Sequence, residues 1–361
     1  MNHRRQIVIG SAAWLIAAST GAATKRAKGS GAKKVALVDD AAPDAVTYGS
    51  REDVVSFAEG VAERHELDAE WVKSSLGQAR FIPAVTRYIM PPTTGTAKNW
   101  AAYRARFVEP IRIRAGIAFW RANQRWLDQA NELYGVPPEI VVGIVGVESI
   151  FGRQMGDFRV IDALATLAFD FPSGRKDRSA FFKEELEAWF VLCKSEGVDP
   201  LAWRGSYAGA LGMAQFMPSS FNKYAVDFDG DGHVDLHSSA ADVIGSVANY
   251  LAEFGWKRGL PARFEVKAPT ETSERAALLA PDIVPTFTAA EMLQHGAWLP
   301  EAALGVDSLL ALVELQNGDA APTYVAGTTN FYALTRYNWS SYYAMAVLEL
   351  GEACGRQRVQ R

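Results

Sequence analysis

The chain has 361 residues, 49% of them hydrophobic, so it is long enough to bury one large hydrophobic core or two to three smaller ones. Its 37 basic and 41 acidic residues give a formal net charge of −4. That balance excludes the basic surface of a typical nucleic-acid-binding protein.

The first 24 residues have the layout of a secretory signal. A basic start precedes an apolar run at residues 7–18, and small residues follow around Ala22. Because the run is too short to span a bilayer, we expect cleavage on export to the periplasm and no transmembrane segment in the mature chain. No cysteine lies near the end of the signal to carry a lipid. The two adjacent arginines in the basic start leave twin-arginine export open beside an ordinary signal.

A predicted helical domain at residues 49–135 follows a lead-in at residues 25–48. The lead-in lacks periodicity and is expected to be disordered. The first helix of the domain is marked by apolar residues on one face, namely Val54, Ala58, Val61 and Ala62. A second, short helix is expected to start near Asp68.

Two further segments complete this domain. Several prolines between residues 80 and 96 predict an extended, exposed segment. Residues 99–134 return to a helical pattern, with a kink or break at Pro110 and an end at Gly135.

Residues 136–152 contain the most unusual helix of the chain. Two prolines suit its first turn, and residues 139–147 are almost all aliphatic or glycine, which predicts a helix buried in a core. One carboxylate, Glu148, interrupts it. Burial there would raise the pKa of Glu148 and keep a proton available near neutrality, as a general acid requires. The alternative is a solvated glutamate at a helix end closed by Gly152.

A glycine-rich stretch at residues 203–218 follows a charged helix predicted at residues 179–196. Glycines of this kind let a backbone approach a ligand closely. After the stretch, a helix is predicted with an apolar face of Val243, Val247, Tyr250, Leu251 and Phe254.

An acidic loop begins at Asp227 and joins the glycine-rich stretch to that helix. Carboxylates at loop positions 1, 3, 5 and 9 and a glycine at position 6 resemble an EF-hand calcium loop. Ser238 replaces the usual glutamate at position 12, so a later carboxylate is expected to close the site. We predict a structural calcium ion and no organic cofactor, the alternative being a solvated acidic turn. The predicted ligands are Asp227, Asp229, Asp231, the His233 carbonyl, Asp235 and Asp242.

The sequence pattern changes in the last third of the chain. Residues 256–327 are short segments punctuated by proline, with an Asn-Gly turn at 317–318, and predict a small β-containing domain. A final helix carrying Tyr343 follows. The two cysteines, Cys193 and Cys354, allow one disulfide or two isolated core thiols, and the sequence leaves both open.

Four motifs occur in the order found in the lytic murein transglycosylase B family, which the chain resembles from about residue 51 to its C-terminus. They are Val147–Gly152, Gly205–Ser220, the Asp227 loop and Tyr337–Tyr343. The resemblance implies a mainly α (α+β) fold with a lysozyme-like core, an N-terminal α domain and a small inserted β domain. The core would comprise residues 136–255 and 328–361.

The resemblance also implies an enzyme that cleaves the β-1,4 bond between N-acetylmuramic acid and N-acetylglucosamine in peptidoglycan and leaves a 1,6-anhydromuramyl end. Glycoside cleavage usually takes two carboxylates, whereas only Glu148 has a suitable setting here. If the 2-acetamido group of the substrate assists, one glutamate can act as acid and then as base. Two alternatives stay open: a goose-type lysozyme, which would use water, and an inactive, calcium-stabilised scaffold that binds peptidoglycan.

The resemblance places the catalytic glutamate at Glu148. It places sugar-binding positions at Ser206, Gln215, Tyr250, Tyr337, Asn338 and Tyr343, with Arg175 and Arg178 as candidates from a longer loop. Taken alone, the serine and glutamine suit turns and the tyrosines suit a core; Tyr343 and Asn338 are favoured over Tyr250 for substrate contact. The expected partners are peptidoglycan glycan strands, with cell-wall synthesis enzymes as further candidates, and the expected state is a monomer.

Overall fold

The computed structural model describes residues 46–91 and 98–359. The predicted signal and nearly all of the predicted lead-in lie outside the described residues. Within these ranges the fold is mostly helical with two small sheets, which confirms the predicted fold class. No helix in the described ranges combines the length and apolar character needed to span a bilayer.

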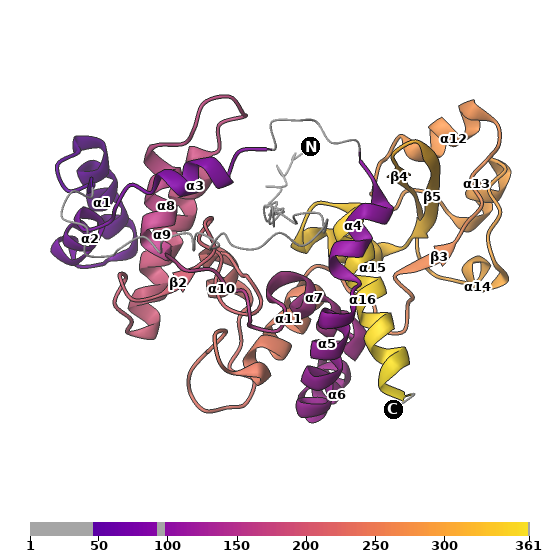
Figure 1. The fold of residues 1–361 in the computed structure, drawn as a ribbon, viewed down its shortest axis with the longest axis horizontal. Coiled ribbons are helices and arrows are strands. Elements are labelled where there is room, and N and C mark those ends of the chain that lie inside the picture. Colours follow the sequence, from indigo (N-terminus) through magenta and orange to yellow (C-terminus); the bar gives the residue numbers. More distant parts are fainter. Residues whose placement is uncertain (1–45, 92–97, 360–361) are drawn as a thin grey trace, which may run out of the picture.

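One group of helices lies at one end of the molecule (Figure 1). It comprises α1 (Glu52–His65), α2 (Ala69–Gly77), α3 (Pro83–Tyr88), α8 (Val160–Phe169) and α9 (Ser179–Glu196). The predicted apolar face of α1 is confirmed, since all four of its residues are buried. Asp68 caps α2 by accepting a hydrogen bond from the Trp71 N–H at 2.7 Å.

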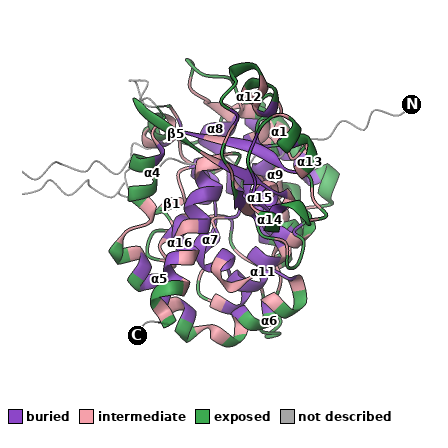
Figure 2. Cartoon of the chain, turned by 90° about the vertical axis from the view of Figure 1, so that its right-hand side faces the viewer, coloured by how far each residue is buried: buried purple, intermediate pink, exposed green. Residues whose placement is uncertain are grey.

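A second group of helices encloses α7 (Pro138–Ser149), which is buried along almost its whole length (Figure 2). The helices that pack on α7 are α5 (Pro110–Ala122), α6 (Gln124–Tyr134), α11 (Ala240–Glu253) and α16 (Ser341–Val359), and α4 (Trp100–Phe107) packs on α16. Two short helices complete the group, α10 (Pro218–Tyr224) and α15 (Thr329–Tyr337). Within residues 49–135, α1–α3 contact α8 and α9, whereas α5 and α6 pack on α7 and α4 packs on α16.

Glycines allow α7 and α16 to cross closely. A Cβ at Gly143 would lie 2.2 Å from the Val347 carbonyl oxygen, and one at Gly351 would lie 2.0 Å from the Glu139 carbonyl oxygen. These distances leave no room for a side chain. The aliphatic run of α7 thus forms a core helix whose first half crosses α16 closely.

A small unit with its own hydrophobic core lies at the other end of the molecule (Figure 1). Its antiparallel sheet has the strand order β3 (Arg263–Glu265), β5 (Ala320–Gly327), β4 (Ala311–Asn317). Three helices that the sequence analysis did not predict cover it, α12 (Thr272–Leu279), α13 (Ala289–Gln294) and α14 (Glu301–Leu304). A separate two-stranded sheet joins β1 (Phe158–Arg159) to β2 (Arg204–Gly205).

Two local predictions were wrong. The segment 80–96 was expected to be extended and exposed, but it contains α3, because Pro83 occupies the first turn of a helix, and Val85 is fully buried. The lead-in was expected to be disordered up to residue 48, but Tyr48 is buried. Its hydroxyl donates to Asp170 at 2.6 Å, which fastens this segment to the end of α8.

Cys193 and Cys354 are both buried and free, so of the two possibilities the structure has isolated core thiols. Burial raises the pKa of the Cys354 thiol to about 12, which makes it unreactive near neutrality.

Candidate active site

Glu148 is the penultimate residue of α7 and is half-buried. Burial raises the pKa of Glu148 to about 7, because the surrounding apolar residues disfavour the ionised carboxylate. A hydrogen bond from Tyr343 acts in the opposite direction. The carboxyl group can therefore hold or release a proton near neutrality, which is what the sequence analysis expected of it.

The turn after Glu148 is tied to the glycine-rich segment. Ser149 is fully buried, and its hydroxyl donates to the Met213 carbonyl oxygen at 2.8 Å while accepting from the Gly152 N–H at 3.0 Å. Ile150 and Phe151 have φ values of 50° and 55°, a left-handed conformation that ends the helix abruptly. The acid is thereby held in a fixed position relative to residues 205–220.

Two tyrosines from the end of the chain line up beside Glu148. The Tyr343 hydroxyl donates to Glu148 Oε1 at 2.6 Å. The Tyr337 hydroxyl donates to the Ala214 carbonyl oxygen at 2.5 Å, and the two rings are stacked with centroids 6.2 Å apart and planes at 14°. The α15–α16 turn, more than 100 residues later in the sequence than α7 and the glycine-rich segment, thus meets both of them at Glu148.

Tyr250 is buried to the same extent as Tyr343. It is 2% exposed, its hydroxyl donates to the Arg336 carbonyl oxygen at 2.7 Å, and its ring lies 4.9 Å from that of Tyr337. In this position the ring of Tyr250 supports the ring of Tyr337.

Asn338 follows Tyr337 directly and is half-buried. Its Oδ1 atom is buried, yet it accepts no hydrogen bond from the described part of the chain. A buried acceptor without a donor is costly, at roughly 1–3 kcal/mol, so this oxygen is well suited to accept a hydrogen bond from a ligand.

Ser206 and Gln215 are both half-buried and both partly engaged by the backbone. The Ser206 hydroxyl accepts from the Ala208 and Ala210 N–H groups at 3.2 and 3.0 Å, which is turn bonding, but its own O–H donates to no described residue. The Gln215 amide nitrogen donates to the Gly212 and Met155 carbonyl oxygens at 2.8 and 3.2 Å. Each side chain therefore retains one unused polar function.

Gln215 also has a strained backbone. Its φ of 52° is a conformation that residues other than glycine rarely adopt, and it costs of order 1 kcal/mol. Such strain persists where the surrounding contacts require it, and the two hydrogen bonds of the Gln215 side chain are contacts of this kind.

Arg175 and Arg178 lie in the loop between α8 and α9. Arg175 is exposed and its guanidinium donates to the Ile89 carbonyl oxygen at the end of α3. Arg178 is half-buried, with its guanidinium 4.4 Å from the centroid of the Phe181 ring, and burial lowers its pKa. Neither arginine has a described contact with Glu148.

Sequence patterns did not reveal Tyr103, which lies on α4. Burial, and then the negative charge of nearby Glu148, raises the pKa of the Tyr103 hydroxyl. Its ring packs against Phe107 at 4.9 Å and Tyr342 at 5.7 Å. Because a tyrosine three residues after Trp100 fits ordinary helix packing, only the tertiary fold shows that it lies near Glu148.

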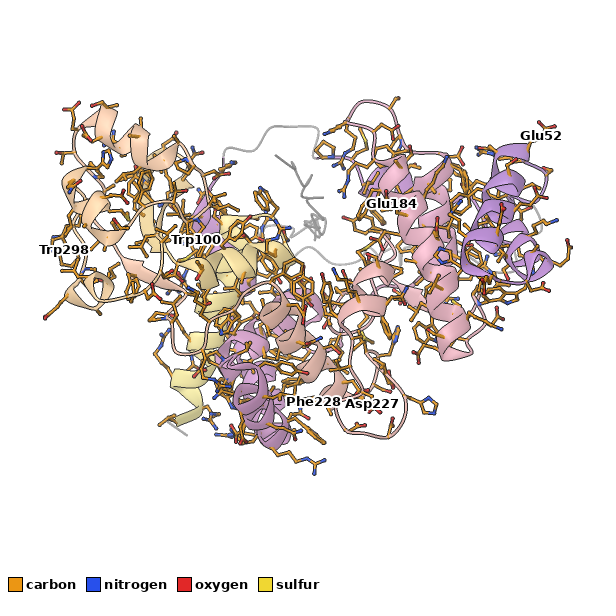
Figure 3. All side chains as sticks on the ribbon, turned by 180° about the vertical axis from the view of Figure 1, so that it is seen from behind. Glu52, Trp100, Glu184, Asp227, Phe228 and Trp298 are labelled. Atoms are coloured by element: carbon orange, nitrogen blue, oxygen red, sulfur yellow. The ribbon has the colours of Figure 1, made fainter. Side chains whose placement is uncertain are left out.

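The acidic loop brings three of the predicted calcium ligands together. One carboxylate oxygen from each of Asp227, Asp229 and Asp242 lies within 4.8 Å of the other two. Asp227 lies next to Phe228 in the loop between α10 and α11 (Figure 3), and the Phe228 ring packs on Trp126 of α6 at 5.9 Å. This packing fixes the loop on the helices around α7.

The other predicted calcium ligands shape the loop in this structure. Asp231 accepts from the His233 N–H at 2.9 Å, and Asp235 accepts from the His237 and Ser238 N–H groups at 2.7 and 2.9 Å. Hard oxygen donors of this number and kind suit Ca²⁺, so the residues fit the ion that the sequence pattern predicted.

Comparison with known proteins gives one consistent result. Residues 49–352 match the model of the Transglycosylase SLT domain family. The membrane-bound lytic murein transglycosylase B of Escherichia coli (strain K12) is 38% identical over 312 residues, covering 84% of this chain and 83% of the relative.

Solved structures of similar fold point to the same family. The Escherichia coli lytic transglycosylase SLT35, in complexes with bulgecin A and with calcium, has 37% identity and a TM-score of 0.74, covering 86% of this chain and 95% of that one. The soluble lytic transglycosylase SltB1 of Pseudomonas aeruginosa has 37% identity and a TM-score of 0.77, covering 85% of this chain and 99% of that one. With its acid-bearing core helix and these matches along most of its length, the chain belongs to the lytic murein transglycosylases, enzymes with the SLT domain and a lysozyme-like fold.

Proposed function

We propose that this chain cleaves the β-1,4 bond between N-acetylmuramic acid and N-acetylglucosamine without water, with Glu148 as acid and then as base. The observation that carries the proposal is the half-buried Glu148, whose pKa burial raises to about 7. Oε1 is held by Tyr343, and Oε2 accepts no hydrogen bond from the described residues. Such a group offers a proton and keeps one oxygen free for the substrate.

The other buried acids with raised pKa values are engaged by the protein. The carboxylate of Glu185 accepts from both the N–H and the hydroxyl of Ser219, at 2.9 and 2.7 Å. The carboxylate of Asp242 accepts from the Phe228 and Asp235 N–H groups. Neither has a free oxygen for a glycosidic bond, which favours a mechanism with one carboxyl group.

In the first step Glu148 gives its proton to the glycosidic oxygen, and the bond from that oxygen to C1 of the muramyl sugar breaks. The acetamido oxygen of the same sugar bonds to C1 and replaces the second carboxylate used by most glycosidases. In the second step ionised Glu148 takes the proton of the O6 hydroxyl. O6 then bonds to C1, the acetamido oxygen leaves, and Glu148 is again protonated.

We assign substrate-positioning roles to the residues around Glu148. The Asn338 Oδ1 atom is the acceptor for the acetamido N–H, because it is buried and has no described donor. Ser206 donates its unused O–H to the substrate, and Gln215 accepts through its Oε1. Tyr343 holds Glu148, and Tyr337 aligns Tyr343.

We assign supporting or binding roles outside the catalytic centre to four further residues, Tyr250, Tyr103, Arg175 and Arg178. Tyr250 supports the ring of Tyr337, and Tyr103 contributes its hydroxyl on the α4 side of Glu148. Arg175 and Arg178 bind the glycan strand further away, from the loop that faces α3. The catalytic core comprises residues 136–255 and 328–361, with α4–α6 packed on it.

We also propose that the acidic loop binds a structural Ca²⁺. The gathered oxygens of Asp227, Asp229 and Asp242 support this, because three carboxylates so close together repel one another without a cation. Asp231, Asp235 and the His233 carbonyl would complete the set, as predicted from the spacing. When bound, the ion supplies charge neutralisation between α10 and α11, and it takes no part in the reaction.

The proposed location is the periplasm of a Gram-negative cell, after cleavage of the signal at residues 1–24, with the enzyme acting as a monomer on glycan strands. The layout of the sequence supports export. N-terminal sequencing of the protein recovered from the periplasm tests this: an uncleaved Met1 would contradict it.

The decisive experiment is digestion of purified sacculi by the wild type and by Glu148→Gln, followed by mass spectrometry of the fragments. We expect anhydro ends from the wild type and a loss of turnover of roughly 10²-fold or more in Glu148→Gln with the melting temperature retained. Fragments heavier by one water would show a lysozyme. Undigested sacculi with the wild type would show a binding scaffold.

A further inference from the structure

An exposed aromatic residue lies beside the glycine-rich segment. Tyr88, the last residue of α3, is 52% exposed. Its ring meets the rings of Tyr207 and Phe158 in edge contacts, with centroids 5.6 and 6.2 Å apart. Tyr207 follows Ser206 directly in the sequence, and Phe158 pairs with Gly205 in the β1–β2 sheet. The Tyr88 ring is thereby held next to the proposed substrate-positioning segment while half of its surface stays open.

A guanidinium group lies at the same place. Arg175 donates to the carbonyl oxygen of Ile89, the residue after Tyr88. Its positive charge also lowers the pKa of the Tyr207 hydroxyl, against the larger raising effect of burial, so Arg175 lies close to Tyr207 as well. Apart from the bond to Ile89, its guanidinium makes no hydrogen bond or ion pair to the described residues. A flat ring and several free N–H donors therefore face solvent together.

We propose that Tyr88 stacks against a sugar ring of the glycan strand and that Arg175 donates to the hydroxyl or acetamido oxygens of that sugar. The inference rests on the proposed function, because Ser206 is what places the strand here. A pyranose ring presents an apolar C–H face that suits an aromatic ring and polar edges that suit a guanidinium. The resemblance to the family assigns Arg175 to the sugar-binding positions, but it does not assign Tyr88.

Exposure alone would not support this proposal, because single exposed aromatic residues are common on protein surfaces. Trp298 is an example: it is 47% exposed, but its ring is covered by the Lys267 ammonium at 5.2 Å. It lies at the outer edge of the small β unit, at the opposite end of the molecule from α1 and α9 (Figure 3). What distinguishes Tyr88 is its contact with Tyr207 and the free donors of Arg175 beside it.

The test measures the Kd of long, peptide-free glycan strands for Glu148→Gln, which binds without cutting. Adding Tyr88→Ala should weaken binding roughly three- to tenfold, the range expected for one aromatic contact. Tyr88→Trp should bind within about twofold of the parent, because it keeps a flat ring. Trp298→Ala, in the same background, is the matched control and should leave the Kd unchanged.

Several outcomes overturn the proposal. Binding by Tyr88→Ala equal to that of the parent removes the stacking contact, and a loss in Tyr88→Trp as large as in Tyr88→Ala shows that the ring face is not what the sugar meets. An equal loss in Trp298→Ala shows a general effect of surface aromatics. If Glu148→Gln itself binds no strand, the proposed function fails, and this result is distinct from the others.

Discussion

Replacing Tyr343 by phenylalanine is expected to move the alkaline limb of the pH–activity profile to higher pH. The Tyr343 hydroxyl donates to Glu148 Oε1 at 2.6 Å, and this bond stabilises the ionised carboxylate. Without it only burial acts, and the pKa of Glu148 rises above its present value of about 7. A hydrogen bond to a charged group contributes roughly 1.5–3 kcal/mol, which corresponds to a rise of about one to two pKa units.

The direction of the expected shift in the pH–activity profile follows from the proposed role of Glu148. In the proposed mechanism cleavage needs protonated Glu148 in the free enzyme, so kcat/KM should fall as pH rises through the pKa of Glu148. Phenylalanine keeps the ring that stacks on Tyr337 at 6.2 Å, so the fold should be retained. The assay is kcat/KM on soluble glycan strands from pH 5 to 9. Tyr337→Phe serves as the control, because its hydroxyl bonds to Ala214 and not to Glu148. A limb that stays in place in Tyr343→Phe, or moves to lower pH, would refute this reasoning.

Three further predictions concern stability. Gly143→Ala should lower the free energy of unfolding by roughly 1–3 kcal/mol in urea titration, because its Cβ would lie 2.2 Å from the Val347 carbonyl oxygen. Gly355→Ala, whose Cβ meets nothing closer than 3.6 Å, should be neutral or stabilising, and an equal loss in both would exclude the close helix crossing as the cause. Glu148→Gln should gain stability over the wild type as pH rises from 4.5 to 7, by about 3 kcal/mol at most, because the unfolded glutamate ionises before the folded one; a difference that is constant with pH would contradict the raised pKa. Chelation should lower the melting temperature of the wild type but not of Asp227→Asn, and an identical response of both would count against the calcium site.

Local sequence patterns were sufficient for most of the helices. The polar loop and charged run before the glycine-rich stretch predicted α9 with the bounds that the structure has, Ser179–Glu196. The aliphatic run with a single acid predicted both the burial of α7 and the raised pKa of Glu148. These features depend on residues within one or two helical turns, which is the range over which periodicity is informative.

Features that depend on distant contacts were missed. The proline count at residues 80–96 suggested an extended chain, because the sequence does not show that Pro83 starts a helix packed on α8. The proximity of Tyr103 to Glu148 likewise arises from how α4 packs on α16. The assignment of Tyr250 to the sugar-binding positions rests on the resemblance and stays a prediction.

The hydrogen bond between Glu148 and Tyr343 joins residues 195 positions apart. The acid is synthesised long before its hydroxyl partner and before α16, the helix that packs against α7. An incomplete chain therefore carries the acid without the contacts that tune it. Destructive activity toward the cell wall should appear all at once, when the last helix docks, and a molecule held unfolded before that moment should be harmless to the cell that makes it.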